Sequence, residues 1–405
     1  MTFARSLAAI PTAARVNRFT YAIRNIVSEA QRVEAAGTRV RYLNIGDPVA
    51  FGFKTPTHLV EAVERAMRDG HNTYGPSAGI PAAREAVAAE YTRTGFPISP
   101  DRVFITAGTS EGIDLTLSAV CENGGEVLVP MPTYPLYTAV LAKLDANAKY
   151  YRLDPSRGWM PDLEHLNSLV TPVTRALVVI DPNNPTGAVY PAETRRALLE
   201  FADRHGLLLL ADEVYGDLGF QGAVPSYGLL DPDAAIVSFS SLSKAYLAPG
   251  WRTGWMAIGR SPRLDDVVAA VRKLADGRLC SNVPMQYAIA PALTGDRSHQ
   301  PAFRRELQGR AELTVNRLRA IPGISCVSPT AAFYVMPRVT LPSGRTDEDY
   351  VKALLHATGV LCVYGSGFGL PADQGFFRIV FLAPLDELRE IYDLMAAFTG
   401  DYLAR

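Results

Sequence analysis

Apolar positions in the first half of the chain fall into short runs that alternate with amphipathic stretches. Six such runs, rich in β-branched or large apolar residues and each followed by polar or Gly/Pro turns, predict strands. They are VFIT (103–106), EVLVP (126–130), KYYRL (149–153), ALVVI (176–180), LLLLA (207–211) and AIVSF (235–239). The connections are long enough for crossovers, which favours an α/β protein with a mostly parallel sheet covered on both faces.

The pattern changes on either side of this region. Before it, apolar residues at helical spacing predict a helix over 21–36, followed by a short strand and a helix from Pro56 to Gly70. After Pro284 the spacing predicts longer helices and short strands, which is typical of a smaller α+β domain. The helices are expected over 286–293, 302–321, 347–358 and from Asp386 onward, and the strands near 324–327, 332–336, 360–363 and 377–381.

We therefore predict three parts of the chain. Residues 1–45 form an N-terminal arm and a helix that packs with the small domain, residues 46–285 form the large domain, and residues 286–405 form the small C-terminal domain. Two domains of ordinary size fit a chain of 405 residues.

Polar and glycine residues stand where the predicted strands end. Because parallel α/β sheets bind ligands beyond the carboxyl ends of their strands, we expect these residues to converge on one site. They are Gly108, Thr109 and Ser110 after the first run, Tyr134 after the second, Asn184 after the fourth, Asp212 after the fifth and Lys244 after the sixth.

Lys244 lies in an unusually basic segment. Residues 234–264 contain no acidic side chain but carry Lys244, Arg252, Arg260 and Arg263, which indicates a pocket for an anion. Desolvation and neighbouring cations lower the pKa of a lysine, and a neutral amine attacks carbonyl carbons, so Lys244 is a candidate Schiff-base lysine. Ser241 and Arg252 are candidate phosphate ligands. The alternative is a surface turn with two solvated cations.

Asp212 ends a strongly apolar run, where an unpaired carboxylate costs several kcal/mol to bury. No lysine or arginine lies between Arg204 and Lys244, so a ligand cation such as a protonated pyridine nitrogen is the expected partner.

The segment AGTSEGI (107–113) has two interpretations. GTSEG matches a G-x-S-x-G nucleophile elbow with Ser110 as the serine of a hydrolase, but the later histidines, His165, His205, His299 and His356, lie in no supporting signature. A helix N-terminus that binds phosphate is favoured, because Ser241 and Arg252 are suited to the same anion. The glycines of GSGFG (365–369) precede no predicted helix, so this segment is interpreted as a turn rather than a dinucleotide loop.

Charge and cysteine content narrow the class of partner. With 40 Lys+Arg against 41 Asp+Glu, the chain has no electrostatic signature of nucleic acid or anionic membrane binding, and its apolar runs are too short to span a bilayer. The four cysteines have no metal-ligand spacing and indicate a reducing, cytoplasmic compartment. A small-molecule partner and no metal are expected.

Several motifs together resemble the class I pyridoxal-phosphate-dependent aminotransferases of fold type I. They are SLSK with the later Arg252, DPNNPTG, ADEVY, MPTYP and FFRIVF. Within that family, LNIGDP followed by FGF, YAIR, PNNPTGAVY and RLCSNVPMQ resemble the alanine transaminase branch. The chain departs at Asp181, where related sequences more often have Asn; Asp181 is expected to lie behind the residues that touch the ligand.

The resemblance implies a homodimer that binds pyridoxal 5'-phosphate. Lys244 would form the aldimine, Asp212 would pair with the pyridine nitrogen, and Tyr215 would join them as the third catalytic residue. The implied cofactor-binding set is Tyr74 from the second subunit, Gly108, Thr109, Ser110, Tyr134, Asn184, Asp212, Tyr215, Ser241, Ser243, Lys244 and Arg252. In this set Tyr134 stacks on the ring, Asn184 and Tyr215 bond its hydroxyl, and Thr109, Ser110, Ser241 and Arg252 hold the phosphate.

For the substrate, Arg378 would bind the α-carboxylate, with Gly46 and Asn184 nearby. Tyr21 and Arg278 are candidates near the side-chain pocket, Arg278 as a contact for a distal carboxylate or, equally, as a structural arginine. The implied activity is amino transfer between alanine and 2-oxoglutarate. Alternatives are an aspartate, aromatic or branched-chain aminotransferase, a carbon-sulfur lyase and, more distantly, a serine hydrolase using Ser110. A pyridoxal-phosphate-dependent regulator would need a DNA-binding domain, for which the sequence shows no signature.

Overall fold

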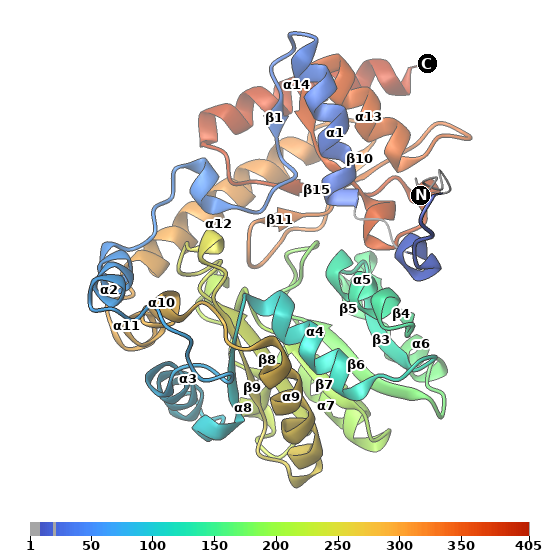
Figure 1. Cartoon of the computed structure of the whole chain (residues 1–405). Coiled ribbons are helices and arrows are strands. Elements are labelled where there is room, and N and C mark those ends of the chain that lie inside the picture. The colour runs from blue at the N-terminus through green and yellow to red at the C-terminus, as the bar shows by residue number, and fades with distance from the viewer. Residues whose placement is uncertain (1–8, 19–21, 405) are drawn as a thin grey trace, which may run out of the picture.

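A mixed eight-stranded sheet forms the centre of the larger part of the molecule (Figure 1). The computed structural model describes residues 9–18 and 22–404. In sheet order the strands are β2 (Val103–Thr106), β9 (Gly254–Ile258), β8 (Ile236–Ser241), β7 (Leu208–Asp212), β6 (Thr174–Ile180), β3 (Glu126–Met131), β4 (Asn147–Asp154) and β5 (Met160–Pro161). The six predicted runs are all strands of this sheet, and the α/β class is confirmed.

The sheet is antiparallel at both edges, through two strands that were not predicted. β9 pairs antiparallel with both β2 and β8, and β5 pairs antiparallel with β4. The block β8-β7-β6-β3-β4 is parallel throughout, so the carboxyl ends of β3, β6, β7 and β8 all point the same way. β9 begins at Gly254, two residues after Arg252, and is a buried strand within the basic segment 234–264.

Helices cover both faces because alternate sheet residues point to opposite sides. Val178 and Ile180 pack on one face beneath α4 (Thr109–Val120), α5 (Pro135–Lys143) and α9 (Asp265–Arg278). Leu177 and Val179 pack on the other face, where four further helices contribute buried residues. These are α3 (Pro81–Arg93), α6 (Leu163–Ser168), α7 (Ala192–Arg204) and α8 (Tyr227–Leu230).

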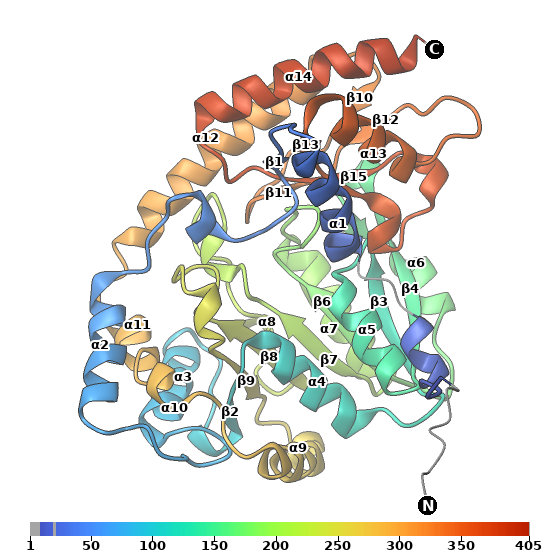
Figure 2. The ribbon, with the colours of Figure 1, turned by 45° about the horizontal axis from the view of Figure 1, so that its top comes forward.

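Three more helices pack beside α3, at the left of Figures 1 and 2: α2 (Thr57–Arg68), α10 (Val283–Gln286) and α11 (Ile289–Thr294). The single helix expected over 286–293 is wrong, since the chain turns at residues 287–288 between α10 and α11. Pro291 has no backbone N–H, so a continuous helix would lack the bond from residue 291 to the carbonyl of residue 287.

The C-terminal part is built on α12 (His299–Arg319) and α14 (Leu385–Leu403), which lie side by side, with α13 (Asp347–Thr358) against α14 (Figure 2). Its central sheet has the order β11 (Tyr334–Val335), β15 (Phe377–Val380) and β14 (Val363–Tyr364). Two-stranded pairs form between β10 (Ile324–Ser325) and β12 (Arg338–Val339) and between β1 (Arg41–Tyr42) and β13 (Val360–Leu361).

The N-terminal segment lies against this C-terminal part. Helix α1 (Ala22–Ala35) contacts α13 and β14, and β1 pairs in parallel with β13. Earlier, the short helical turn η1 (Ala14–Arg18) lies on α5, where Arg18 pairs with Asp145 at 2.5 Å. The boundaries at residues 45 and 285 stay a prediction. Within residues 9–18 and 22–404, no helix has the length and apolar character that a membrane span requires.

Candidate active site

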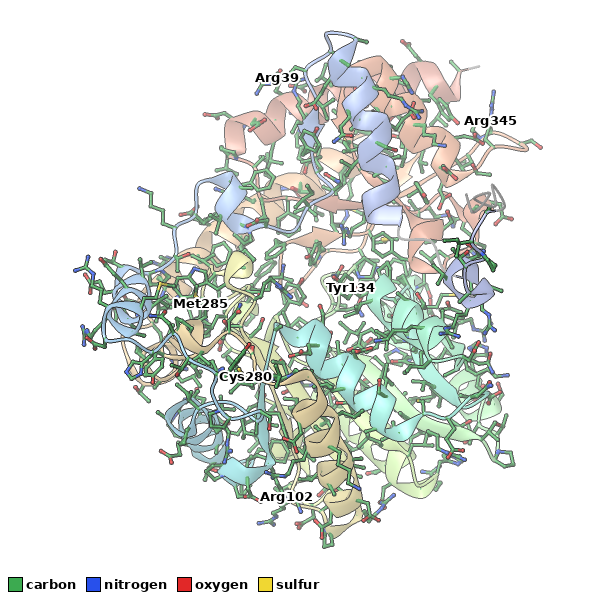
Figure 3. All side chains as sticks on the ribbon, viewed as in Figure 1. Arg39, Arg102, Tyr134, Cys280, Met285 and Arg345 are labelled. Carbon is green, nitrogen blue, oxygen red and sulfur yellow. The ribbon has the colours of Figure 1, made fainter. Side chains whose placement is uncertain are left out.

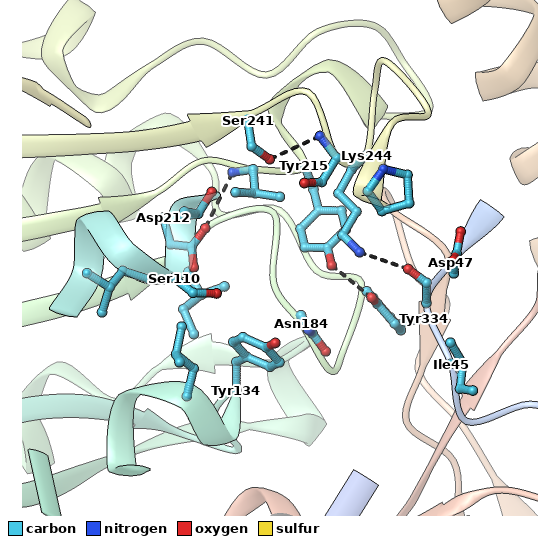
Figure 4. A pocket seen from close by; sticks show the side chains of 18 of the residues that line it. Ile45, Asp47, Ser110, Tyr134, Asn184, Asp212, Tyr215, Ser241, Lys244 and Tyr334 are labelled. Atoms are coloured by element: carbon cyan, nitrogen blue, oxygen red, sulfur yellow. Dashed lines mark hydrogen bonds between the residues drawn. The ribbon is translucent and has the colours of Figure 1, made fainter. Parts of the chain in front are cut away.

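A cavity of about 670 Å³ lies between the carboxyl ends of the parallel strands and the C-terminal part of the chain (Figure 4). Large-domain loops supply most of its walls, the segment 44–47 closes another side, and β11 and β15 contribute Tyr334 and Arg378. Of the predicted residues, those lining it are Gly46, Thr109, Ser110, Tyr134, Asn184, Asp212, Tyr215, Ser241, Ser243, Lys244, Arg252 and Arg378.

Lys244 follows β8 and projects into this cavity (Figure 4). Its Nζ donates a hydrogen bond to the carbonyl oxygen of Gly46 at 2.8 Å, and it makes no ion pair with any carboxylate among the described residues. Burial lowers the pKa of Lys244 to about 8; Asp47 opposes this shift, while Arg252 adds to it. The amine therefore loses its proton much more readily than an ordinary lysine, which favours a nucleophilic role.

Asp212 ends β7 on the far side of the cavity and is almost fully buried. It accepts a hydrogen bond from the Tyr137 hydroxyl at 3.0 Å, and in the described part of the chain no lysine or arginine pairs with it. Burial raises the pKa of Asp212 to about 6, although the Tyr137 bond acts in the opposite direction. A cationic group bound beside this carboxylate would hold it ionised.

The N-terminus of α4 forms an anion-binding corner. Thr109 and Ser110 are the first residues of α4, and Ser241 lies across from them at the end of β8. Arg252 has a left-handed backbone (φ +51) and donates to the carbonyl oxygens of Pro249 and Ala107 at 3.1 and 3.2 Å. Free helix N–H groups, hydroxyls and a guanidinium together suit a phosphate.

Gly108, just before α4, does not line the cavity, but the close approach of Arg252 requires a glycine at this position. It has φ +78, and a Cβ there would lie 2.2 Å from Nη2 of Arg252.

Two other basic residues of the segment are not part of the corner, which corrects the expectation of a four-cation pocket. Arg260 and Arg263 instead pair with Asp233 and Asp203 outside the cavity.

Arg378 lies on β15 at the opposite end of the cavity, and its side chain is buried. Nη1 donates to Oδ1 of Asn184 at 3.1 Å, and Nη2 donates to the carbonyl oxygen of Asn44 at 2.6 Å. The guanidinium is thereby fixed beside the turn that carries Asn184. A planar, permanently charged fork in a cavity is suited to a carboxylate.

The turn that carries Asn184 is supported from below by Asp181. Asp181 does not line the cavity; its Oδ2 accepts from Nε of Arg195 at 2.7 Å and from the Tyr227 hydroxyl at 3.0 Å. Above it, Asn183 accepts from the backbone N–H and hydroxyl of Thr186, which closes the turn. Asp181 thus has the supporting position expected from the sequence.

Two further predicted residues that the structure describes, Tyr74 and Arg278, do not line the cavity. Tyr74 is 84% exposed and lies outside it. Arg278 pairs with Glu111 at 3.1 Å and donates to the carbonyl oxygen of Ile105 at 2.8 Å, contacts that match the structural-arginine alternative. Tyr21 lies outside the described residues.

Four residues at the site were not predicted: Asn44, Asp47, Tyr137 and Tyr334. Tyr334 and Asp47 line the cavity, and the Tyr334 hydroxyl lies 2.8 Å from that of Tyr215 (Figure 4). The one available signal was the hydroxyl of a tyrosine inside the apolar run AAFYVM, since a buried tyrosine hydroxyl usually has a polar partner.

The hydrolase interpretation of Ser110 has no support in the geometry. No histidine among the described residues lines the cavity, so Ser110 lacks the histidine of a Ser-His-Asp hydrolase there. GSGFG forms a short helical turn, η8 (Gly365–Phe368), that ends at Gly369 and leads into no α-helix. Within the described part of the chain, no group of three His, Cys, Asp or Glu side chains is arranged to hold a metal.

Comparison with known proteins gives the class that this fold and cavity belong to. The family model described as aminotransferase class I and II matches residues 39–393. The chain therefore belongs to the class I and II aminotransferases, and it is an enzyme of fold type I that transfers amino groups.

Particular relatives are similar over nearly the whole chain. The alanine aminotransferase of Mycobacterium tuberculosis is 38% identical, covering 97% of this chain and 94% of that protein. The glutamate-pyruvate aminotransferase AlaA of Escherichia coli is 35% identical, with 97% and 98% covered. Among solved structures, the alanine aminotransferase from Pyrococcus furiosus superimposes with a TM-score of 0.94 at 37% identity, covering 96% of this chain and all of that one.

Proposed function

We propose that the cavity binds pyridoxal 5'-phosphate. The donor set fits each part of this molecule: the corner at α4 suits its phosphate, the uncompensated Asp212 suits a protonated pyridine nitrogen, and Lys244 suits its aldehyde. Tyr134 lies on the wall between these groups, at the junction of the two parts of the molecule (Figures 3 and 4), and suits the ring face. The observation that carries the proposal is that Lys244 and Asp212 line the same cavity without forming an ion pair with each other.

In the proposed reaction, Lys244 moves the proton. When bound, the cofactor supplies an electron sink for the pair of electrons left as the substrate Cα–H bond breaks. The Nζ of Lys244 would take the proton from the substrate Cα and deliver it to the cofactor carbon that carries the nitrogen, and it would make the reverse transfer for the amino acceptor. Its lowered pKa suits both directions of this transfer.

Asp212 and Arg378 set the electrostatics and the orientation. Asp212 would hold the proton on the pyridine nitrogen, to which a contact ion pair contributes about 4 kcal/mol at an effective dielectric near 20. Arg378 would bind the α-carboxylate through parallel N–H groups and so restrict rotation about the bonds at Cα. Asn184 and Tyr215 would bind the ring hydroxyl, and Tyr215 has Tyr334 as its neighbour.

We further propose alanine and 2-oxoglutarate as the amino donor and acceptor. The support is that relatives with 35–38% identity are named alanine aminotransferase or glutamate-pyruvate aminotransferase. An aspartate aminotransferase of Geobacillus stearothermophilus is more distant, at 31% identity over 92% of this chain.

A donor panel tests the substrate. The purified holoenzyme is assayed with 2-oxoglutarate and alanine, aspartate, tyrosine or leucine, and separately with cystathionine in the absence of an acceptor. We expect alanine to have the highest kcat/KM by at least about tenfold, a difference of about 1.4 kcal/mol in transition-state binding. A higher value for aspartate or tyrosine, or release of a 2-oxo acid from cystathionine alone, would reassign the substrate.

We also propose a homodimer in the cytoplasm. The support for the dimer is Tyr74, whose exposed position outside its own cavity is what a residue serving a second subunit requires. For the compartment, the support is that Cys121, Cys280, Cys326 and Cys362 are all unpaired.

A further inference from the structure

Two aromatic rings lie within cation–π distance of the guanidinium of Arg378 on β15. The Tyr334 ring, on β11, has its centroid 4.9 Å from Cζ of Arg378. The Phe368 ring, in η8 after β14, has its centroid 4.8 Å from the same atom. β11 and β14 are the two neighbours of β15 in the sheet, so one ring comes from a neighbouring strand and the other from the turn that follows the second neighbour.

These contacts act together with the hydrogen bonds of Arg378. Asn184 and the backbone of Asn44 engage its terminal nitrogens, while the rings pack against it within cation–π distance. The hydrogen bonds at the edge of the guanidinium and the rings packed against it together restrict this planar group to one orientation. A carboxylate that binds through two N–H groups depends on that orientation.

Phe368 is itself held in place from two directions. The buried Asp347, at the start of α13, accepts from the backbone N–H of Ser366 at 2.5 Å and from its hydroxyl at 2.9 Å. The carbonyl oxygen of Phe368 accepts from the backbone N–H of Thr133 at 2.9 Å, one residue before Tyr134. The GSGFG turn therefore ties the C-terminal part of the chain to the cavity wall of the large domain.

Tyr334 has a second contact, on the cofactor side of the cavity. Its hydroxyl lies 2.8 Å from the Tyr215 hydroxyl. Gly46 leaves room for it, since a Cβ on residue 46 would lie 2.2 Å from the Tyr334 oxygen. One side chain thus touches both Arg378 and Tyr215.

We propose that Phe368 and Tyr334 are positioning residues: their rings fix the guanidinium plane of Arg378 for the substrate α-carboxylate, and the Tyr334 hydroxyl orients Tyr215. This inference rests on the proposed function and deepens it, because it explains how carboxylate recognition is built from the GSGFG turn and β11.

Two ligands separate carboxylate recognition from amine binding. 2-Methylalanine has no Cα proton to lose, and isopropylamine is the same skeleton without the carboxylate. The dissociation constant of each is measured from the absorbance change of the holoenzyme. Phe368→Leu should raise the dissociation constant of 2-methylalanine by about 3- to 30-fold, the range expected for the loss of a cation–π contact. The dissociation constant of isopropylamine should change by less than about twofold.

Phe376→Leu is the matched control. Phe376 is a buried phenylalanine of the same part of the chain that also lies near an arginine, Arg338, at 5.7 Å, but neither residue lines the cavity. The Phe376→Leu variant should leave the ratio of the two dissociation constants at the wild-type value.

The Tyr334 variants separate ring from hydroxyl. Tyr334→Phe keeps the ring, so it should retain the wild-type ratio of the two dissociation constants while shifting the pH midpoint of the cofactor absorbance. Tyr334→Leu removes the ring and should weaken 2-methylalanine binding relative to isopropylamine binding, as Phe368→Leu does. Tyr334→Leu carries the test should Phe368→Leu not fold. Equal weakening of both ligands, or of neither, in these Leu variants would overturn the inference alone. A wild-type protein without cofactor absorbance would overturn the proposed function and this inference with it.

Discussion

At the scale of single residues, burial acts on Asp212 and Lys244 in opposite directions. It raises the pKa of the carboxyl group to about 6 and lowers that of the amine to about 8. In the apoenzyme, burying either group in its charged form therefore costs free energy. A cation beside Asp212 and a covalent bond at Lys244 relieve both costs, so cofactor binding and folding stability are linked.

Asp212→Asn should stabilise the protein without cofactor. The folded state binds the Asp212 proton more tightly than the unfolded chain, whose pKa is near 3.8, so this contribution is complete below that value and is lost as the pH rises through about 6. The neutral variant avoids the loss. Urea unfolding should give equal stabilities near pH 4 and an advantage of roughly 3 kcal/mol for the variant at pH 7.5.

The same variant should lose activity, by on the order of 10³-fold in kcat, because the pyridine nitrogen loses its ion-pair partner. Parallel stability curves for the two proteins between pH 4 and 7.5 would show that Asp212 does not bear the proposed burial cost.

Sequence reasoning at this scale succeeded where a charge lacked local partners. Asp212 and Lys244 were both identified because no residue of opposite charge lies near them in the chain. Tyr334 and Tyr137 were missed because their partners, Tyr215 and Asp212, are 119 and 75 residues away, and the local sequence does not identify the partner of a buried tyrosine hydroxyl.

At the scale of elements, the N-terminus of α4 depends on the close approach of Gly108 and Arg252. Gly108→Ala should lower the affinity of the apoenzyme for pyridoxal phosphate by at least about tenfold, the equivalent of losing one charged hydrogen bond, because a methyl group would displace the guanidinium. Affinity for pyridoxal, which has no phosphate, should change less. Both are measured by fluorescence titration.

Gly124→Ala provides the control for backbone strain. Gly124 has φ +79, close to that of Gly108, but a Cβ there would meet nothing within 4 Å. Gly108 also has ψ 168, a region that is essentially restricted to glycine, so its alanine variant carries an additional backbone cost. The comparison of pyridoxal phosphate with pyridoxal is made within one variant, so this cost largely cancels from the phosphate selectivity. Equal loss of phosphate selectivity in the two would remove Arg252 from the phosphate site.

The turn after β6 depends on the buried pair of Asp181 and Arg195. Arg195→Ala should lower the free energy of unfolding by about 3–5 kcal/mol, because it leaves a buried carboxylate without its cation. Urea denaturation measures this, with Arg260→Ala as the control that removes an arginine from an exposed pair and should change little. Equal effects of the two variants would mean that Asp181 is not held as an ion.

Elements with a clear apolar period were predicted well, and those shaped by tertiary contacts were not. The six predicted strands and α13 follow their local patterns. β9 was missed because GWMAI lies inside the basic segment, whose charges dominated its interpretation, and its antiparallel pairing depends on β2, about 150 residues earlier. The convergence of strand ends followed from the parallel topology alone.

At the scale of the whole molecule, the proposed dimer makes a specific prediction for Tyr74. If Tyr74 serves the partner's site, Tyr74→Ala and Lys244→Ala each impair every site of their own homodimers. A mixed dimer would contain one site with both residues intact. Mixing the two variants after partial unfolding and refolding should therefore restore activity, in proportion to the mixed dimer isolated by two different affinity tags.

Mixed dimers no more active than the separate homodimers would place Tyr74 outside the partner's site. An unmixed sample of each variant, refolded in the same way, controls for recovery during refolding.

The central claim is a covalent bond between Lys244 and the cofactor, and borohydride reduction of the holoenzyme tests it most directly. Reduction fixes the bond, and peptide mass spectrometry then locates the phosphopyridoxyl group. We predict the label on Lys244, on no other lysine, and neither label nor absorbance band in Lys244→Ala. A label on another lysine, or an unchanged spectrum in the variant, would contradict the account.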